Sequence, residues 1–204
     1  SAFIACENNH RLMRTELAGT HAITSAATGE RPDVLAIDAG LGLRPEEQSM
    51  KVAFIGTHGV GKTTLCYDLG SALKRRGLNV DLVKEVARLS PLPINRKTSL
   101  EAQTWIFMTQ IAEEIRSGSQ HDIVVCDRSV LDNYAYMMFG FGRQGAIERF
   151  MYHWMKSYDL LFKVPSTGEL AADGVRDTDA FFAHAIDQLV DQLLAERKVP
   201  HACL

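Results

Sequence analysis

The sequence predicts an α/β protein in which a parallel β-sheet lies between two layers of helices. From Lys51 onward, short apolar segments alternate with longer segments whose apolar residues recur at helical spacing. The segment 123–126 is apolar at every position, as strands buried on both faces are. No internal repeat is found, which favours a single layered domain over a repeat architecture.

The expected elements follow one another along the chain. The expected strands are residues 51–55, 79–83, 123–126, 160–164 and 199–204. The expected helices are residues 63–76, 98–118, 131–139, 146–157 and 179–196. Gly77 and Gly118 are placed to end the first two helices, because glycine readily adopts the left-handed conformation of a helix end. We therefore expect five parallel strands joined by helical crossovers.

Each long helix has a predicted buried face. In the first helix this face carries Leu65, Leu69, Ala72 and Leu73. The second helix begins at the capping box formed by residues 98–101, and its predicted face carries Trp105, Met108, Ala112 and Ile115. In the last helix the face carries Phe182, Ile186, Leu189, Val190 and Leu193. These faces are expected to pack against the sheet.

The composition is that of an ordinary globular protein, with 46% hydrophobic and 23% charged residues. The net charge of -3 provides no basic field, so neither a nucleic-acid polymer nor an anionic membrane is an expected partner. The four cysteines are spread singly, which favours reduced thiols without zinc. The apolar runs are too short to span a bilayer. We expect a cytoplasmic protein.

The chain divides into two parts by sequence character. Residues 1–49 have no sustained period and are expected to be a poorly structured extension or to contain a single extra strand over 33–38. Glu7 and other polar residues make a secretory signal a poor interpretation of this extension. The nucleotide-binding domain is expected to cover residues 50–204, with Met50 at its start.

The segment 56–63 has the spacing G-x-x-x-x-G-K-[ST] between a strand and a helix. Such a loop binds phosphate with its backbone N–H groups and the positive end of the helix. Lys62 is predicted to reach the β- and γ-phosphates, and the Thr63 hydroxyl to ligate Mg²⁺. The predicted nucleotide-binding residues are Gly56, Thr57, His58, Gly59, Val60, Gly61, Lys62, Thr63 and Thr64. Of these, His58 is expected to point away from the phosphates.

An acidic and a basic residue, Asp127 and Arg128, follow the buried strand 123–126. The ends of parallel strands face the same ligand crevice, so Asp127 is predicted as a second Mg²⁺ ligand, directly or through water. The planar guanidinium of Arg128 suits the transferring phosphoryl group or an oxygen of the acceptor. The alternative is an ion pair at the end of a strand. With the phosphate loop, the two residues favour phosphoryl transfer.

The run from Asp127 to Tyr136 resembles the Asp/Glu-Arg segment of the thymidylate and deoxynucleoside kinases. From about Lys51 onward the chain also resembles the AAA-type P-loop domains related to the nicotinamide riboside kinases. The resemblance implies a P-loop NTPase fold with a five-stranded parallel sheet. It further implies ATP and Mg²⁺ as cofactors and a small nucleoside-like or nucleotide-like phosphoryl acceptor. Whether the chain forms a homodimer is left open by the sequence.

Two further residues match family sites. Glu85 follows the second strand, where nucleoside kinases keep a carboxylate that accepts the proton of the acceptor hydroxyl, and is a candidate base. Arg176 lies where these kinases have a lid, and is a candidate to screen the charge on the phosphates. A solvated Glu85–Arg88 pair and an exposed loop arginine are the alternatives. Catalytic roles are thus predicted for Lys62, Glu85, Asp127, Arg128 and Arg176.

The acceptor side allows several interpretations. Gln103, Trp105 and Gln110 are candidates for the floor of an acceptor pocket, although core packing is the favoured interpretation of Trp105. A GTPase is disfavoured because no Asn-Lys-x-Asp or Asp-x-x-Gly motif occurs. The remaining alternative to a kinase is a P-loop ATPase or a nucleotide-binding regulatory module that acts on a protein partner.

Overall fold

The computed structural model describes residues 49–94, 98–166 and 177–204. Within this part of the chain, residues 49–203 form one compact unit. The strand predicted over residues 33–38 and the lid candidate Arg176 lie outside the described residues. The domain boundary near residue 49 therefore stays a prediction.

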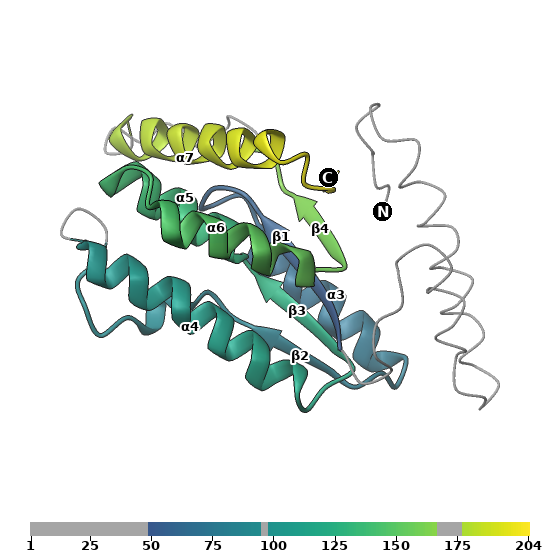
Figure 1. The fold of residues 1–204 in the computed structure, drawn as a ribbon. Helices are drawn as coiled ribbons and strands as arrows, with labels where there is room; N and C mark the ends of the chain where they lie inside the picture. Colours follow the sequence, from purple (N-terminus) through teal and green to yellow (C-terminus); the bar gives the residue numbers. More distant parts are fainter. Residues whose placement is uncertain (1–48, 95–97, 167–176) are drawn as a thin grey trace. The chain divides into compact units, whose positions relative to one another are not determined.

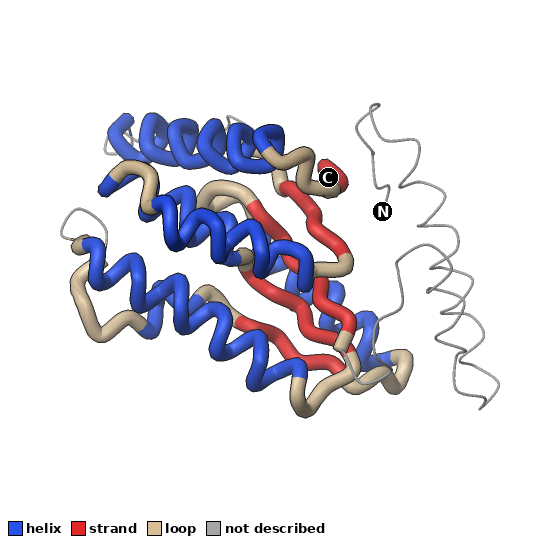
Figure 2. The backbone as a smooth tube through the Cα atoms, viewed as in Figure 1, coloured by secondary structure: helices blue, strands red, loops and turns tan. Residues whose placement is uncertain are grey.

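Five parallel strands form a single sheet in the order β2-β3-β1-β4-β5. The strands are β1 (Met50–Ile55), β2 (Val80–Val83), β3 (Ile123–Asp127), β4 (Leu160–Lys163) and β5 (Ala202–Cys203). Figure 2 shows the strands in red between blue helices. The predicted fold class, a five-stranded parallel sheet flanked by helices, is confirmed.

Helices cover both faces of this sheet (Figure 1). The helices are α3 (Lys62–Arg75), α4 (Leu100–Gly118), α5 (Val130–Phe141), α6 (Gly145–Trp154) and α7 (Asp177–Glu196). Two 3₁₀ turns, η2 (Val86–Leu89) and η4 (Met155–Ser157), lie after β2 and α6. Helix α3 lies behind the sheet in Figure 1 and contacts β1, β2 and β3, whereas α4 lies in front of it and contacts β2 and β3. Parallel strands require such crossovers, so both faces of the sheet are buried.

The largest part of the core lies around α5, which contacts α4, α6 and α7. Nearly every residue of its first two turns is buried, because the helix is surrounded on several sides. The core side chains there are Val130, Leu131, Tyr134, Ala135 and Met137. Residues of α7 complete it, with Ile186, Val190 and Leu193 fully buried, as the sequence predicts for its apolar face.

The predicted face of α4 is wrong. Met108 and Ile115 are 44% and 57% exposed, Ala112 is exposed, and Trp105 is half-buried. The buried face instead carries Ala102, Gln103, Ile106, Phe107, Gln110, Ile111, Glu114 and Ser117. Apolar spacing misled the prediction because three of the deepest residues on this face are polar. The N-cap is Ser99, whose side chain accepts a hydrogen bond from the Ala102 N–H at 3.2 Å.

Polar residues are buried on α4 because they have partners from distant segments. The Glu114 carboxylate accepts hydrogen bonds from Lys51 Nζ at 2.9 Å, Trp154 Nε1 at 2.8 Å and the Tyr158 hydroxyl at 2.5 Å. It also accepts one from Gln110 Nε2 at 2.9 Å. A buried carboxylate is tolerated only when its lone pairs are occupied in this way. The network therefore joins β1, α4 and the segment before β4.

Among the described residues, no helix combines the length and the apolar character that crossing a bilayer requires.

Candidate active site

Three glycines with positive φ angles shape the loop between β1 and α3. The φ angle is 132° at Gly56, 77° at Gly59 and 89° at Gly61. Gly61 directly precedes α3 and has no side chain with which to cap that helix end. The N–H groups of the first helical turn are thus left available to an anion. This stretch has the geometry that the sequence spacing predicts for a phosphate-binding loop.

Gly56 is held from two sides. A Cβ atom at this position would lie 2.6 Å from the carbonyl oxygen of Val164, just after β4, so only glycine fits there without a backbone shift. The Gly56 N–H donates a hydrogen bond to Asp132 Oδ1 at 2.8 Å. The first residue of the loop is therefore packed against the residue that follows β4 and hydrogen-bonded to α5.

Lys62 is the first residue of α3 and is only 4% exposed. Its ammonium group donates to the carbonyl oxygen of Thr57 within the loop. Burial lowers the pKa of Lys62 to about 8, and the nearby Arg128 charge acts in the same direction, although nearby carboxylates oppose it. A phosphate group bound in the loop would give this buried ammonium group an anionic partner.

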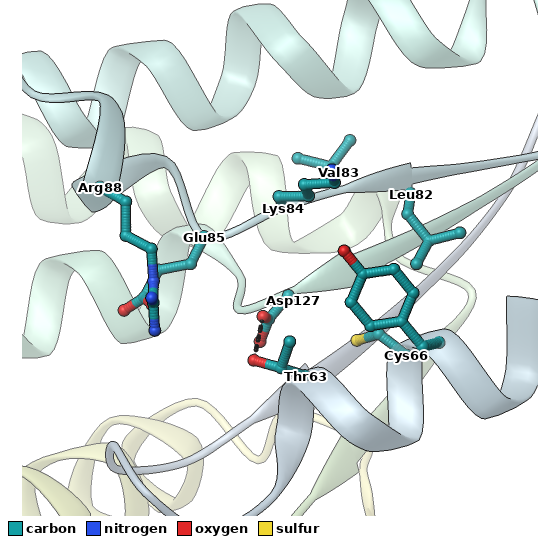
Figure 3. A pocket seen from close by; sticks show the side chains of 9 residues that line it. Thr63, Cys66, Leu82, Val83, Lys84, Glu85, Arg88 and Asp127 are labelled. Atoms are coloured by element: carbon teal, nitrogen blue, oxygen red, sulfur yellow. Dashed lines mark hydrogen bonds and ion pairs between the residues drawn. The ribbon is translucent and has the colours of Figure 1, made fainter.

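A hydroxyl and a carboxylate meet beside the loop. Thr63 Oγ1 donates to Asp127 Oδ2 at 2.5 Å, which Figure 3 shows as a dashed line. The two residues meet because β1 and β3 are parallel neighbours, with Phe54 opposite Asp127, so the strands end at the same edge of the sheet. Both groups offer oxygen atoms, the ligands that Mg²⁺ prefers, so this pair fits the predicted metal site.

Arg128 follows β3 with a φ angle of 89°, a conformation that L-residues rarely adopt. It is 6% exposed, and its guanidinium carbon lies 5.0 Å from the centre of the Tyr136 ring. Its Nε donates to Glu85 Oε1 at 2.9 Å. Its Nη1 has no hydrogen-bond partner among the residues that the structure describes. A buried donor without a partner is costly, so this side of Arg128 is suited to an anionic ligand.

Glu85 lies between two arginines. Its Oε1 pairs with Arg128, and its Oε2 accepts from Arg88 Nε at 2.8 Å. Burial works to raise the pKa of Glu85, but the charge of Arg128 and the hydrogen bonds from both arginines outweigh it, so the pKa is lowered. Glu85 is therefore ionised at neutral pH and orients Arg128.

Two adjoining pockets share Thr63, Glu85, Arg88 and Asp127 in their walls. One extends over the phosphate loop, where it is lined by His58, Gly59, Gly61, Lys62 and Arg128. The other extends between α3 and β2 (Figure 3), where it is lined by Cys66, Tyr67, Leu82, Val83 and Lys84. The Cys66 thiol is buried, which raises its pKa, so it contributes an uncharged wall.

The remaining loop residues lie at the edge of this centre, with His58 in the wall of the pocket over the loop. His58 lies toward the helices, with its Nδ1 3.3 Å from the Tyr136 hydroxyl and its ring 5.7 Å from that of Phe182. Val60 is half-buried, and Thr64 is exposed on the first turn of α3.

The three predicted floor residues of the acceptor pocket have other contacts. Gln103 Nε2 donates to Thr98 Oγ1 at 2.9 Å. Gln110 is fully buried, and its amide contacts Glu114 and, at 3.4 Å, the carbonyl oxygen of Arg128. None of the three residues, Trp105 included, lines either of the two pockets described above. Gln110 thus contacts the backbone of Arg128 and does not face the pockets.

Sequence reasoning missed one residue of this region, Asp132. Its carboxylate contacts both the phosphate loop and the turn that follows Arg128. The available signal was the spacing Ser129-x-x-Asp132 at the start of a helix, which is that of a capping box.

Comparison with known proteins connects this geometry to one family. Residues 51–204 match the sequence model of a family described as an AAA domain. A probable thymidylate kinase of Thermoplasma acidophilum is 25% identical over 133 residues, which cover 63% of this chain and 67% of the relative. The crystal structure of thymidylate kinase from Ehrlichia chaffeensis matches with a TM-score of 0.56 at 20% identity. That match covers 76% of this chain and 92% of the other. The chain thus shares its fold with a thymidylate kinase, and the expected resemblance is confirmed.

Proposed function

The chain belongs to the AAA domain family of P-loop proteins, and from this premise we propose that it transfers the γ-phosphoryl group of ATP to a small nucleoside-like or nucleotide-like acceptor. The observation that carries the proposal is the buried Arg128, whose Nη1 has no hydrogen-bond partner among the described residues and whose side chain lines the same pocket as Lys62. Two buried cations at one pocket suit the negative charge that develops during phosphoryl transfer.

Each residue has a distinct role in this proposal. The backbone of residues 56–64 holds the phosphates, and Lys62 contacts the β- and γ-phosphates. Thr63 and Asp127 hold Mg²⁺, which supplies charge neutralisation at the phosphates when bound. Arg128 stabilises the transferring group. Arg176 is proposed as a lid residue, although it lies outside the described residues.

The reaction joins an acceptor oxygen to the γ-phosphorus and breaks the bond between that phosphorus and the β,γ-bridging oxygen, which leaves as part of ADP. The acceptor proton passes to Glu85 in this proposal. The lowered pKa of Glu85 makes it a weak base, which suffices because bonding to the acceptor is weak in a loose transition state.

The charge of the pocket favours an acceptor that already carries a phosphate. Arg88 and Lys84 are exposed cations in the pocket walls, and neither is buried by another element. Phosphate oxygens match such groups better than a neutral nucleoside does. The name of the Thermoplasma acidophilum relative points in the same direction, toward thymidylate.

An acceptor screen tests the proposal. ADP formation from Mg·ATP would be measured alone and with thymidylate, the other nucleoside monophosphates, nucleosides and nicotinamide riboside, with Lys62→Ala as the blank. We expect one acceptor, most readily a nucleoside monophosphate, to raise ADP formation at least about tenfold, because a bound acceptor supplies the oriented nucleophile. Steady ATP hydrolysis that no acceptor changes would contradict the kinase and favour an ATPase or a regulatory nucleotide-binding module.

A further inference from the structure

We infer that Asp132 is a positioning residue, which locks the first glycine of the phosphate loop to the turn that carries Arg128. Asp132 lies in the first turn of α5 and is fully buried. Its two carboxylate oxygens have different partners, one in the loop and one beside Arg128. The catalytic consequence rests on the proposed function, whereas the consequence for nucleotide binding does not.

On the loop side, Asp132 Oδ1 accepts the hydrogen bond from the Gly56 N–H at 2.8 Å. Gly56 has little freedom to find another partner, because its φ angle is 132° and the Val164 carbonyl blocks its other side. A charged acceptor for this N–H holds the loop in its curled form before any phosphate arrives, which lowers the cost of ordering it on binding.

On the arginine side, Asp132 Oδ2 accepts from the Ser129 N–H at 2.8 Å and from Ser129 Oγ at 2.9 Å. Ser129 directly follows Arg128, whose strained φ angle must be held by its surroundings. Because the same carboxylate also contacts Gly56, a shift of the turn would be transmitted to the loop. Two segments that are 76 residues apart, Gly56 and Asp132, are thus connected through a single side chain.

Asp132 also contributes charge. Its carboxylate attracts both Lys62 and Arg128, the two buried cations of the site, whose charges repel each other. A neutral side chain at this position would leave that repulsion less compensated. Geometry and charge therefore act in the same direction.

A simpler role for Asp132 would be to cap α5, and Ser129 separates the two roles. Ser129 Oγ accepts from the Leu131 N–H at 3.1 Å, and the serine is the other half of the capping box. Ser129→Ala removes the serine half of the cap but leaves the bond between Gly56 and Asp132 in place. Asp132→Asn keeps the size of the side chain, yet its single amide oxygen cannot accept from both Gly56 and Ser129, and its NH₂ group would face a donor.

Calorimetry of Mg·ATP binding without acceptor, on the full chain, tests the inference. We expect Kd to rise about tenfold or more in Asp132→Asn and by less than about twofold in Ser129→Ala, since a charge-assisted bond to the loop is lost only in the first. Equal effects of the two variants on Kd would overturn the inference and leave Asp132 as a helix cap. Because no acceptor is present, this result does not depend on the outcome of the acceptor screen.

The Gly56 amide resonance gives a second, spectroscopic readout. In the nucleotide-free protein we expect this proton to resonate at lower field than an amide without a carboxylate acceptor, to move upfield in Asp132→Asn, and to stay in place in Ser129→Ala. A resonance that does not move in Asp132→Asn would contradict the inference. If Asp132→Asn does not fold, Asp132→Glu, which keeps the charge on a longer side chain, is expected to show the same upfield shift and a smaller rise in Kd, and unchanged values would again contradict it.

Discussion

The two sides of the candidate site are built in different ways. The phosphate side is a contiguous loop whose shape comes from glycine backbone, with Gly56, Gly59 and Gly61 at positive φ angles. The opposite side consists of side chains from separate elements, with Arg128 after β3 held by Glu85 after β2 and by Tyr136 of α5. A backbone-built site is encoded locally, whereas a side-chain-built site exists only after distant segments have packed.

This difference predicts opposite sensitivities. The phosphate side should be most sensitive to an added Cβ atom and to the loss of its one lysine, because the backbone cannot adjust. The other side should be most sensitive to the shape of its charged groups, since Arg128 and Glu85 recognise each other through directed hydrogen bonds.

Loss of the lysine should have the largest effect. Lys62→Ala is expected to lower kcat by about a thousandfold, because contacts to the transferring phosphates act mainly in the transition state. The measurement is steady-state ADP formation with the acceptor found in the screen. Lys74, an exposed lysine in the last turn of the same helix, provides the control, and Lys74→Ala should leave kcat unchanged. Full turnover in Lys62→Ala would contradict the assignment of the loop.

A change of shape at constant charge should have the next largest effect. Arg128→Lys is expected to lower kcat about a hundredfold, because an ammonium group cannot donate to Glu85 and to the ligand in the same fork geometry. Arg116→Lys is the matched control, since Arg116 is an exposed arginine that pairs with Glu113 on α4 and lines neither pocket, and it should change kcat less than about threefold. Full activity in Arg128→Lys would show that charge alone matters on this side.

An added methyl group should destabilise the protein more in the phosphate loop than at an ordinary helix end. Gly56→Ala is expected to lower the free energy of unfolding by about 2–3 kcal/mol, from backbone strain and a clash with the Val164 carbonyl. Gly77→Ala, at a φ angle of 81° but with no atom within 4 Å of the added Cβ, should cost about 1 kcal/mol. Urea unfolding measures the loss of unfolding free energy in each variant. Equal losses would show that the close contact with the Val164 carbonyl does not destabilise Gly56→Ala.

The smallest effect concerns the pH dependence of stability. Because the folded state lowers the pKa of Glu85, its contribution is present above the pKa of the unfolded state and is lost as the pH falls through the folded value. Glu85→Gln should therefore be less stable than the wild type by about 1 kcal/mol at pH 7, with the gap closing below pH 4. Thermal unfolding of the variant and the wild type at pH 7 and below pH 4 measures this stability gap. A stability gap that is the same at both pH values would contradict this assignment.

Most of the fold could be predicted from the sequence. The strands and helices were found within a few residues because alternating apolar segments and the glycine loop report local structure. The buried face of α4 could not be found in the same way. Glu114 and Ser117 are buried because Lys51, Tyr158 and Asp81 pair with them from distant segments, and Gln110 contacts the Arg128 carbonyl, so no local pattern contains those partners.

The candidate site divides along the same line. The loop residues and the pairing of Thr63 with Asp127 follow from spacing and from the parallel sheet. By contrast, the Glu85–Arg88 pair was an alternative that the sequence offered, but its connection to Arg128 could not be predicted, since it depends on how η2 approaches the end of β3. The double contact of Asp132 was hidden for a similar reason, because its second partner is a backbone N–H far away in the sequence.

The position of β1 has a consequence for synthesis on the ribosome. It is the first of the described strands to be translated, yet it lies between β3 and β4, which come later. Lys51 meets Asp159 only after a further 108 residues, which take roughly 5–20 s at usual translation rates. Until β3 emerges the apolar segment 52–55 has both edges unpaired, and the edge that faces β4 stays unpaired through the whole interval, so a nascent chain stalled before β3 should be the form most prone to aggregate and most dependent on chaperones.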